Sequence, residues 1–154
     1  MTGREQATLK DLGGASTRRL EVTVMSFGYK ESAPPLANMV FDVRFLKNPY
    51  WIPELRPLTG LDQPVRDYVL KQELAVQFLD SLTALLAGVL PRFVEFEIFD
   101  FAVALGCTGG QHRSTALAAA LSGRLAAMFP AYSIVTRHRE LPSIGSSGDG
   151  GEDA

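Results

Sequence analysis

The feature that most constrains this chain is an apolar, strand-like segment that runs through a glycine-containing turn into a helical pattern. Residues 99–105 read FDFAVAL and predict a buried strand, whereas residues 112–128 carry leucines at helical spacing. Gly109 and Gly110 stand in the turn between them, where glycine permits unusual backbone angles. A strand, a tight turn and a helix in this order are typical of α/β proteins.

The rest of the chain extends this pattern. Alternating and β-branched segments predict strands at 20–27, 39–43 and 132–136. A helical pattern begins with Asp62 as an acidic cap and runs to about Leu90, where Pro91 marks its end. We expect a single-domain α/β sandwich with a small mixed, partly parallel sheet and flanking helices. Its predicted core includes two helical stripes: Leu74, Phe78, Leu82, Leu85, Leu86 and Val89, and Leu117, Leu121, Leu125 and Met128.

Composition divides the chain into three parts. Residues 1–18 show little apolar periodicity, and residues 142–154 are rich in Gly, Ser and acid, so we expect both ends to be disordered. The folded unit is then 19–141. Within it, the segment 44–60 contains three prolines, Pro49, Pro53 and Pro57, and predicts a long irregular loop of the kind that is often functional.

Charge and cysteine content narrow the function. The net charge is −2, and residues 19–141 balance twelve basic against twelve acidic residues, so a general nucleic-acid surface is not indicated. The one cysteine, Cys107, excludes an internal disulfide and fits a reducing compartment. The N-terminal residues are polar and no run of about 18 apolar residues occurs, so we expect a cytoplasmic protein without a membrane span.

The turn after the 99–105 strand predicts an anion site. Backbone N–H groups at the start of a helix are unpaired and favour phosphate. Arg113 adds a permanently charged fork for phosphate oxygens, and the hydroxyls of Thr108 and Ser114 add donors. We expect a phosphorylated small molecule to bind at residues 107–114. The alternative is an ordinary strand-to-helix turn with a solvated arginine.

Several motifs in one order resemble a known family. They read SFGYK (26–30), VFDVRFLKNPYW (40–51), RPLTGLDQPV (56–65), GCTGGQHRS (106–114) and RHREL (137–141). Together they resemble the C-terminal domain of the RapZ family of RNase adapters and nucleotide-binding proteins, over nearly all of 19–141. The resemblance implies a non-catalytic binding or sensor domain without a cofactor, which acts as a regulatory adapter.

Knowledge of that family implies ligands, partners and site residues. The best-known member senses glucosamine-6-phosphate and binds a small regulatory RNA, and related members respond to an amino-sugar nucleotide. A P-loop domain precedes this domain in full-length members. The resemblance therefore implies RNA or a regulatory protein, a separate P-loop protein and self-association as partners. It places Thr108, Gly109, Gly110, His112 and Arg113 at the ligand, with Asp42, Arg44 and Tyr50 on a facing loop.

The chain departs from the family pattern in three ways. It contains no GxxxxGK[ST] segment, so residues for P-loop nucleotide binding are missing. Gln111 stands where some members carry lysine, and the end of the chain is acidic rather than basic. The last two departures weaken the prediction of RNA binding, because affinity for a phosphate backbone requires several Lys or Arg contacts.

Other readings of the same residues remain open. Cys107, Arg113 and Ser114 match the spacing of cysteine-dependent phosphatases, in which Asp62 or Asp42 would supply the proton for the leaving group. The residue before the cysteine is Gly106, where those enzymes usually have histidine. His112, His138 and the cysteine match no zinc pattern, so we expect no metal.

The last strand is followed by Arg137, His138 and Arg139, which form either a solvated strand end or a basic clamp beside Arg113. Asp42 and Arg44 share a strand face and form either an ion pair or a ligand contact. Tyr50 and Trp51 fill the loop or stack on a ligand ring.

Overall fold

The computed structural model describes residues 18–142, and the predictions for the rest of the two ends lie outside this range. Its strands, helices and one 3₁₀ turn occur in the order β1 (Glu21–Gly28), β2 (Met39–Asp42), η2 (Pro49–Trp51), α2 (Gln63–Leu70), α3 (Glu73–Glu95), β3 (Asp100–Cys107), α4 (Arg113–Met128) and β4 (Ser133–His138). The strand order in the sheet is β2-β3-β1-β4. The α/β fold predicted from the sequence is confirmed.

All pairings in this sheet are parallel, where the sequence predicted a mixed sheet. β3 lies between β2 and β1, so these two consecutive strands do not pair. Parallel strands have their carboxyl ends at one edge. Gly28, Asp42, Cys107 and His138 therefore all end their strands at the same edge of the sheet, where ligands of open α/β sheets bind.

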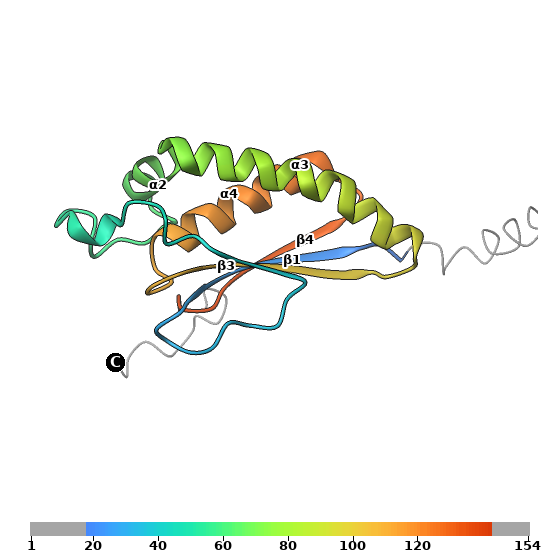
Figure 1. The fold of residues 1–154 in the computed structure, drawn as a ribbon, viewed down its shortest axis with the longest axis horizontal. Helices are drawn as coiled ribbons and strands as arrows, with labels where there is room; N and C mark the ends of the chain where they lie inside the picture. The colour runs from blue at the N-terminus through green and yellow to red at the C-terminus, as the bar shows by residue number, and fades with distance from the viewer. Residues whose placement is uncertain (1–17, 143–154) are drawn as a thin grey trace, which may run out of the picture.

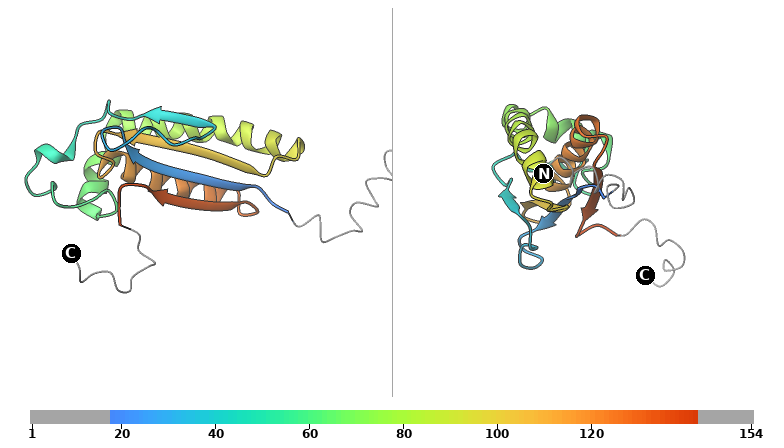
Figure 2. Two further views of the ribbon diagram at one scale, coloured as in Figure 1. Left: turned by 90° about the horizontal axis from the view of Figure 1, so that it is seen from below. Right: turned by 90° about the vertical axis from the view of Figure 1, so that its right-hand side faces the viewer.

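The helices α2, α3 and α4 lie on one face of the sheet (Figure 1), and an end-on view shows the same two layers (Figure 2). Val22 and Val24 of β1 and Val103 of β3 belong to the same buried cluster as Leu117 and Leu121 of α4. Each such side chain contributes roughly 1.5–3 kcal/mol when fully buried. This core fixes the carboxyl edge of the sheet against the first turn of α4.

Three details of the helices differ from the sequence prediction. The pattern over 62–90 is broken between α2 and α3, where the side chain of Gln72 bonds to the backbone N–H and carbonyl of Lys47. Pro91 lies inside α3, which continues to Glu95 because Phe93 packs edge-on against Phe101 at 4.9 Å. Asp62 precedes α2, but its carboxylate accepts from the N–H of Thr59 rather than from the helix.

The predicted apolar stripe of α3 is confirmed in part. Leu82 and Leu86 are buried, and Phe78 and Val89 pack against the core as partly buried residues. Leu74 and Leu85 are instead half exposed, and at the end of α4 Met128 is exposed as well. The sequence missed three further buried apolar residues of α3: Ala75, Leu79 and Leu90. By length and composition alone α3 could span a membrane, with a mean hydropathy of 1.6 over its most apolar window. Its buried residues instead join the same core cluster as the sheet.

Candidate functional site

The loop of residues 108–112 joins the end of β3 to the start of α4 and lies against the end of β1. The N–H of Tyr29 donates to the carbonyl of Cys107 at 2.8 Å, and that of Lys30 to Thr108 at 3.1 Å. A Cβ on Gly28 would stand 2.5 Å from the backbone carbon of Gly109, and Gly110 has a φ of +74°. Only glycine at these two positions lets the loop approach the strand this closely.

Four of the five carbonyls of this loop accept hydrogen bonds, whereas its N–H groups have no protein acceptor within residues 18–142. The carbonyls of Gly110, Gln111 and His112 accept from the Thr115 hydroxyl, from the N–H of Gly60 and from the N–H of Ala116. Among the described residues, no backbone N–H from Thr108 to His112 donates to a protein acceptor. These N–H groups therefore keep donor capacity close to the positive end of α4, which is favourable for an anion.

Arg113 is the first residue of α4 and is 5% exposed. Its Nη1 donates to the carbonyls of Arg44 and Leu46, each at 3.1 Å, and its Nη2 lies 3.4 Å from the Thr108 hydroxyl. The buried Nε has no partner among the described residues. One side of the guanidinium thus holds the 44–46 backbone, while the other side has donor capacity left for a ligand.

Cys107 is buried at the end of β3 and contacts the first residues of α4. Its Sγ accepts from the N–H of Ser114 at 3.4 Å and lies 3.2 Å from the Ser114 hydroxyl. The Ser114 hydroxyl also donates to the carbonyl of Phe27 at 3.3 Å. The sulfur therefore sits over the first turn of α4, and Ser114 ties that turn to β1.

His112 and Gln111 face the 44–60 segment. Gln111 Nε2 donates to the carbonyls of Arg56 at 3.1 Å and Leu58 at 2.7 Å. His112 Nε2 lies 3.2 Å from the same Arg56 carbonyl, which accepts when the imidazole proton is on that nitrogen. Burial lowers the pKa of His112 below its usual value, so the ring is neutral at pH 7.

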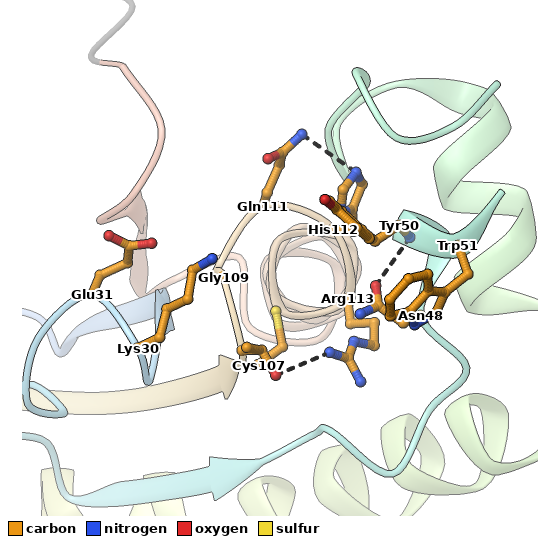
Figure 3. Close-up of a pocket in the computed structure, with 11 residues that line it drawn as sticks. Lys30, Glu31, Asn48, Tyr50, Trp51, Cys107, Gly109, Gln111, His112 and Arg113 are labelled. Atoms are coloured by element: carbon orange, nitrogen blue, oxygen red, sulfur yellow. Dashed lines mark hydrogen bonds between the residues drawn. The ribbon is translucent and has the colours of Figure 1, made fainter. Parts of the chain in front are cut away.

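A cavity of about 360 Å³ opens over the loop. Figure 3 shows Lys30 and Glu31 on one side of it and Tyr50 and Trp51 on the other. Tyr50 is 44% exposed and Trp51 is 73% exposed, and their rings meet edge-on at 5.2 Å. Its full lining is Lys30, Glu31, Asn48, Tyr50, Trp51, Cys107, Thr108, Gly109, Gln111, His112 and Arg113. The cavity thus combines cations, a carboxylate and aromatic faces.

Asp42 and Arg44 bond to one another beside this cavity and do not line it. Arg44 Nη2 donates to Asp42 Oδ2 at 2.7 Å and its Nε to Oδ1 at 2.9 Å. The hydrogen bond from Arg44 is the main cause that lowers the pKa of Asp42. The Arg44 guanidinium also covers the ring of Tyr29 at 4.2 Å. Of the two predicted roles, the ion pair is the one that forms.

Arg137, His138 and Arg139 line a different hollow, of about 460 Å³, together with Leu61 and Leu141. Arg139 donates to the carbonyls of Ala33, Ser32 and Gly28 and to the carboxylate of Glu140. His138 Nδ1 lies 2.7 Å from the Ser26 hydroxyl. None of the three lines the cavity that contains Arg113, so the predicted clamp is not formed in this structure.

Of the other predicted site residues, Gly110, Ser114 and Asp62 do not line the cavity. Asp62 is exposed at the start of α2, and its carboxylate is used by Thr59. Among residues 18–142, no cluster of three His, Cys, Asp or Glu side chains could hold a metal ion.

The model of the RapZ C-terminal domain matches residues 20–142. The chain belongs to this family. The resemblance inferred from the motifs is thereby confirmed, and the match covers every element that positions the loop.

Relatives of the family carry the name "Nucleotide-binding protein". Those of Clavibacter michiganensis, Cutibacterium acnes and Moorella thermoacetica are 47%, 49% and 42% identical to this chain over 132, 122 and 141 residues. The matches cover 86%, 79% and 92% of this chain but 45%, 41% and 46% of those proteins. The chain therefore spans less than half the length of these relatives.

The structure adds cavity residues that the sequence did not assign to a ligand, namely Lys30, Glu31 and Asn48. Trp51, for which stacking on a ligand ring was one of two predicted roles, joins Tyr50 in the lining. Lys30 and Trp51 each close a motif that carries the family resemblance, SFGYK and NPYW, and this was the available signal. Their meeting at the loop depends on strand order, which the sequence alone did not reveal.

Proposed function

We propose that this chain is a non-catalytic binding and sensing domain for a phosphorylated small molecule of the amino-sugar phosphate or nucleotide-sugar class, and that it acts as a regulatory adapter. The observation that carries the proposal is the polarity of the loop. Four of its five carbonyls accept hydrogen bonds from the protein, while the N–H groups from Thr108 to His112 have no acceptor in the part of the chain that the structure describes. A phosphate offers the acceptors that these donors lack.

The charges around the loop support a phosphate. Arg113 retains an unpaired buried Nε, and Lys30 stands on the other side of the cavity. Charge-assisted hydrogen bonds contribute roughly 1.5–3 kcal/mol each, against about 0.3–1 kcal/mol for the helix dipole. The affinity should therefore come mainly from the loop N–H groups and the two cations.

The rest of the cavity supports a ligand that is larger than phosphate. A volume of about 360 Å³ lies in the range of small-molecule sites. The exposed rings of Tyr50 and Trp51 offer faces for a sugar or a base, and the carboxylate of Glu31 offers an acceptor for an amine or hydroxyl. These groups fit a phosphorylated amino sugar or its nucleotide.

Calorimetry with glucosamine-6-phosphate, with UDP-linked N-acetylglucosamine and with unphosphorylated glucosamine tests this proposal. We expect one or both phosphorylated compounds to bind and glucosamine to bind at least tenfold more weakly, a loss of about 1.4 kcal/mol. A Cβ on Gly109 would meet nothing within 4 Å, so Gly109→Ala should fold normally and place a methyl group at the phosphate. Gly123→Ala, a helix position that is equally open, is the matched control.

Two results would count against the proposal. The first is the absence of binding by both phosphorylated compounds at millimolar concentration. The second is equal affinity of Gly109→Ala and the control for the ligand, because a ligand bound against the loop would clash with the added methyl group.

RNA binding is the second candidate for the adapter role. Arg137 is exposed and lines the 460 Å³ hollow near the end of β4, where a phosphate backbone could approach it. The RNA hypothesis predicts salt-sensitive retardation of RNA that is lost in Arg137→Ala/Arg139→Ala. Indifference of RNA retardation to this double substitution would argue against it.

Phosphatase activity is supported by one contact, the Ser114 N–H that donates to Cys107 Sγ and would stabilise a thiolate. Of the two predicted acids, neither lines the cavity, since Asp62 binds Thr59 and Asp42 binds Arg44. Turnover of a phosphomonoester that disappears in Cys107→Ser would establish this activity. Turnover that is absent in the wild type would remove it.

A further inference from the structure

Three consecutive side chains tie the segment 44–60 to the loop of residues 108–112, called the phosphate loop below, and to the first residue of α4. Gln111 donates to the carbonyls of Arg56 and Leu58, His112 lies against Arg56, and Arg113 donates to Arg44 and Leu46. The N–H of Gly60 returns to the carbonyl of Gln111 at 2.9 Å. The same short loop therefore presents backbone donors to the cavity and holds the opposite wall of that cavity by its side chains.

The side-chain amide of Gln111 lines the cavity but is bonded to the protein. Its Nε2 carries two hydrogens and has three protein atoms within hydrogen-bond distance: the two carbonyls of the 44–60 segment and, at 3.3 Å, His112 Nε2 (Figure 3). The side-chain amide nitrogen is thus occupied by the protein, although Gln111 lines the cavity. Arg56, which receives one of these bonds, in turn donates from its Nε to the carbonyl of Tyr50 at 2.8 Å and covers the Tyr50 ring at 4.7 Å.

This chain of contacts runs from the loop to the aromatic wall. Gln111 holds the backbone at Arg56, the Arg56 side chain holds Tyr50, and Tyr50 meets Trp51 edge-on. Leu46, Leu55 and Leu58 anchor the segment in or against the core, whereas Trp51 at its tip is largely exposed. The tip consequently depends on polar contacts for its position more than the ends of the segment do.

We infer that Gln111 is a positioning residue that couples occupancy of the phosphate loop to the placement of the Tyr50–Trp51 wall. The inference rests on the proposed function, since it assigns a regulatory step to the same site. A ligand that orders the loop N–H groups also orders the backbone of Gln111 and, through its side chain, the 44–60 segment. Thermodynamic linkage is reciprocal. If the ligand favours the ordered segment by a given factor, a substitution that removes this coupling must lower the ligand affinity by the same factor.

The experiment uses Trp51, the one tryptophan of the chain, as a built-in reporter. Glucosamine-6-phosphate and inorganic phosphate are the probes, and calorimetry, Trp51 emission, acrylamide quenching and hydrogen exchange over 44–60 are the readouts. Gln111→Met keeps the side-chain length and removes the donors without adding charge. Gln111→Lys restores a donor, and Gln77→Met on the outer face of α3 is the matched control.

In the wild type and in Gln77→Met, we expect ligand to change Trp51 emission and to slow exchange in the segment. Gln111→Met should bind the probes about fivefold more weakly. In this variant, Trp51 should be more accessible to acrylamide without ligand and should no longer respond to ligand. Gln111→Lys should restore the Trp51 response. A role in stability alone would lower the melting temperature without this loss and rescue.

The inference is overturned if Gln111→Met folds, binds within twofold of the wild type and retains the full Trp51 response. It is equally overturned if exchange and quenching of the free variant match the wild type, a comparison that needs no ligand. Failure of the wild type to bind any phosphorylated probe would instead overturn the proposed function, so the two failures are distinguishable.

Discussion

The ends of β3 and β4 carry similar residues but differ in how many of their hydrogen-bond donors have a protein acceptor. Each is a parallel strand that ends at the same edge of the sheet, and each has a histidine and an arginine near its end. His138 is the last residue of β4 and Arg139 follows it, whereas His112 and Arg113 both follow β3. After β4, the N–H of Arg139 donates to Ser26, and its guanidinium uses all three of its nitrogens on protein acceptors. After β3, the N–H groups of the loop and the Nε of Arg113 have no protein acceptor among the described residues.

An arginine near a strand end is therefore not sufficient for an anion site. Arg139 stabilises the protein because it closes the turn of residues 28–33 onto the end of β4. Arg113 stabilises the protein as well, because its Nη1 holds the 44–46 backbone. Its other nitrogens keep donor capacity that a ligand could use. What separates the two is the number of acceptors that the surrounding backbone already supplies.

The largest effect should come from closing the gap between the loop and β1. In Gly28→Ala the new Cβ would meet backbone atoms of Gly109 at 2.5 Å, which no side-chain rotation relieves. We expect a loss of about 2–4 kcal/mol in the free energy of unfolding and no binding of phosphorylated ligand. Urea unfolding measures the first and calorimetry the second. A stable Gly28→Ala variant with wild-type affinity would show that this close approach does not shape the site.

The second largest effect is expected from alanine substitution of the two arginines. Arg113→Ala leaves the Arg44 and Leu46 carbonyls without their donor, so we expect a loss of roughly 2–3 kcal/mol of stability together with the loss of ligand binding. Arg139→Ala should cost about 1–2 kcal/mol, because its contacts are more exposed, and should leave ligand affinity within twofold. Reversal of this order, with Arg139→Ala abolishing binding, would move the anion site to the end of β4.

The smallest expected effect is that of pH on stability, through the two histidines. Burial lowers the pKa of His112 and of His138 from the usual value of 6.5. The unfolded chain therefore takes up protons first, so both groups should reduce stability as the pH falls through 6.5 toward their lowered pKa values. A bound phosphate favours the imidazolium, so ligand should raise the pKa of His112, which lines the cavity, and leave that of His138 unchanged.

Proton NMR titration of the two imidazoles, with and without ligand, measures this difference. An equal response of both rings, or a response of His138 alone, would contradict the assignment of the ligand to the loop after β3.

The sequence predicted the parts of this molecule that local patterns determine. The strand, turn and helix around Gly109 follow from apolar runs and glycines, and the position of Arg113 at the helix start follows from the same pattern. The break before α3 and the helical turns after Pro91 escaped prediction, because Gln72 bonds to Lys47 and Phe93 packs on Phe101, which are contacts between distant segments. Lys30 and Trp51 reach the cavity for the same reason, through strand order and loop tethering.

An anion bound at the backbone N–H groups from Thr108 to His112 would perturb these amides directly. The most direct measurement is a ¹H–¹⁵N correlation spectrum of the chain, titrated with inorganic phosphate and with glucosamine-6-phosphate, with sodium chloride as the ionic control. We predict that the largest amide shifts occur at residues 108–112, accompanied by the Arg113 Nε–H, while the amides of 137–140 remain still. Saturable shifts that centre on 137–140, or a loop that does not respond to either compound, would contradict the account.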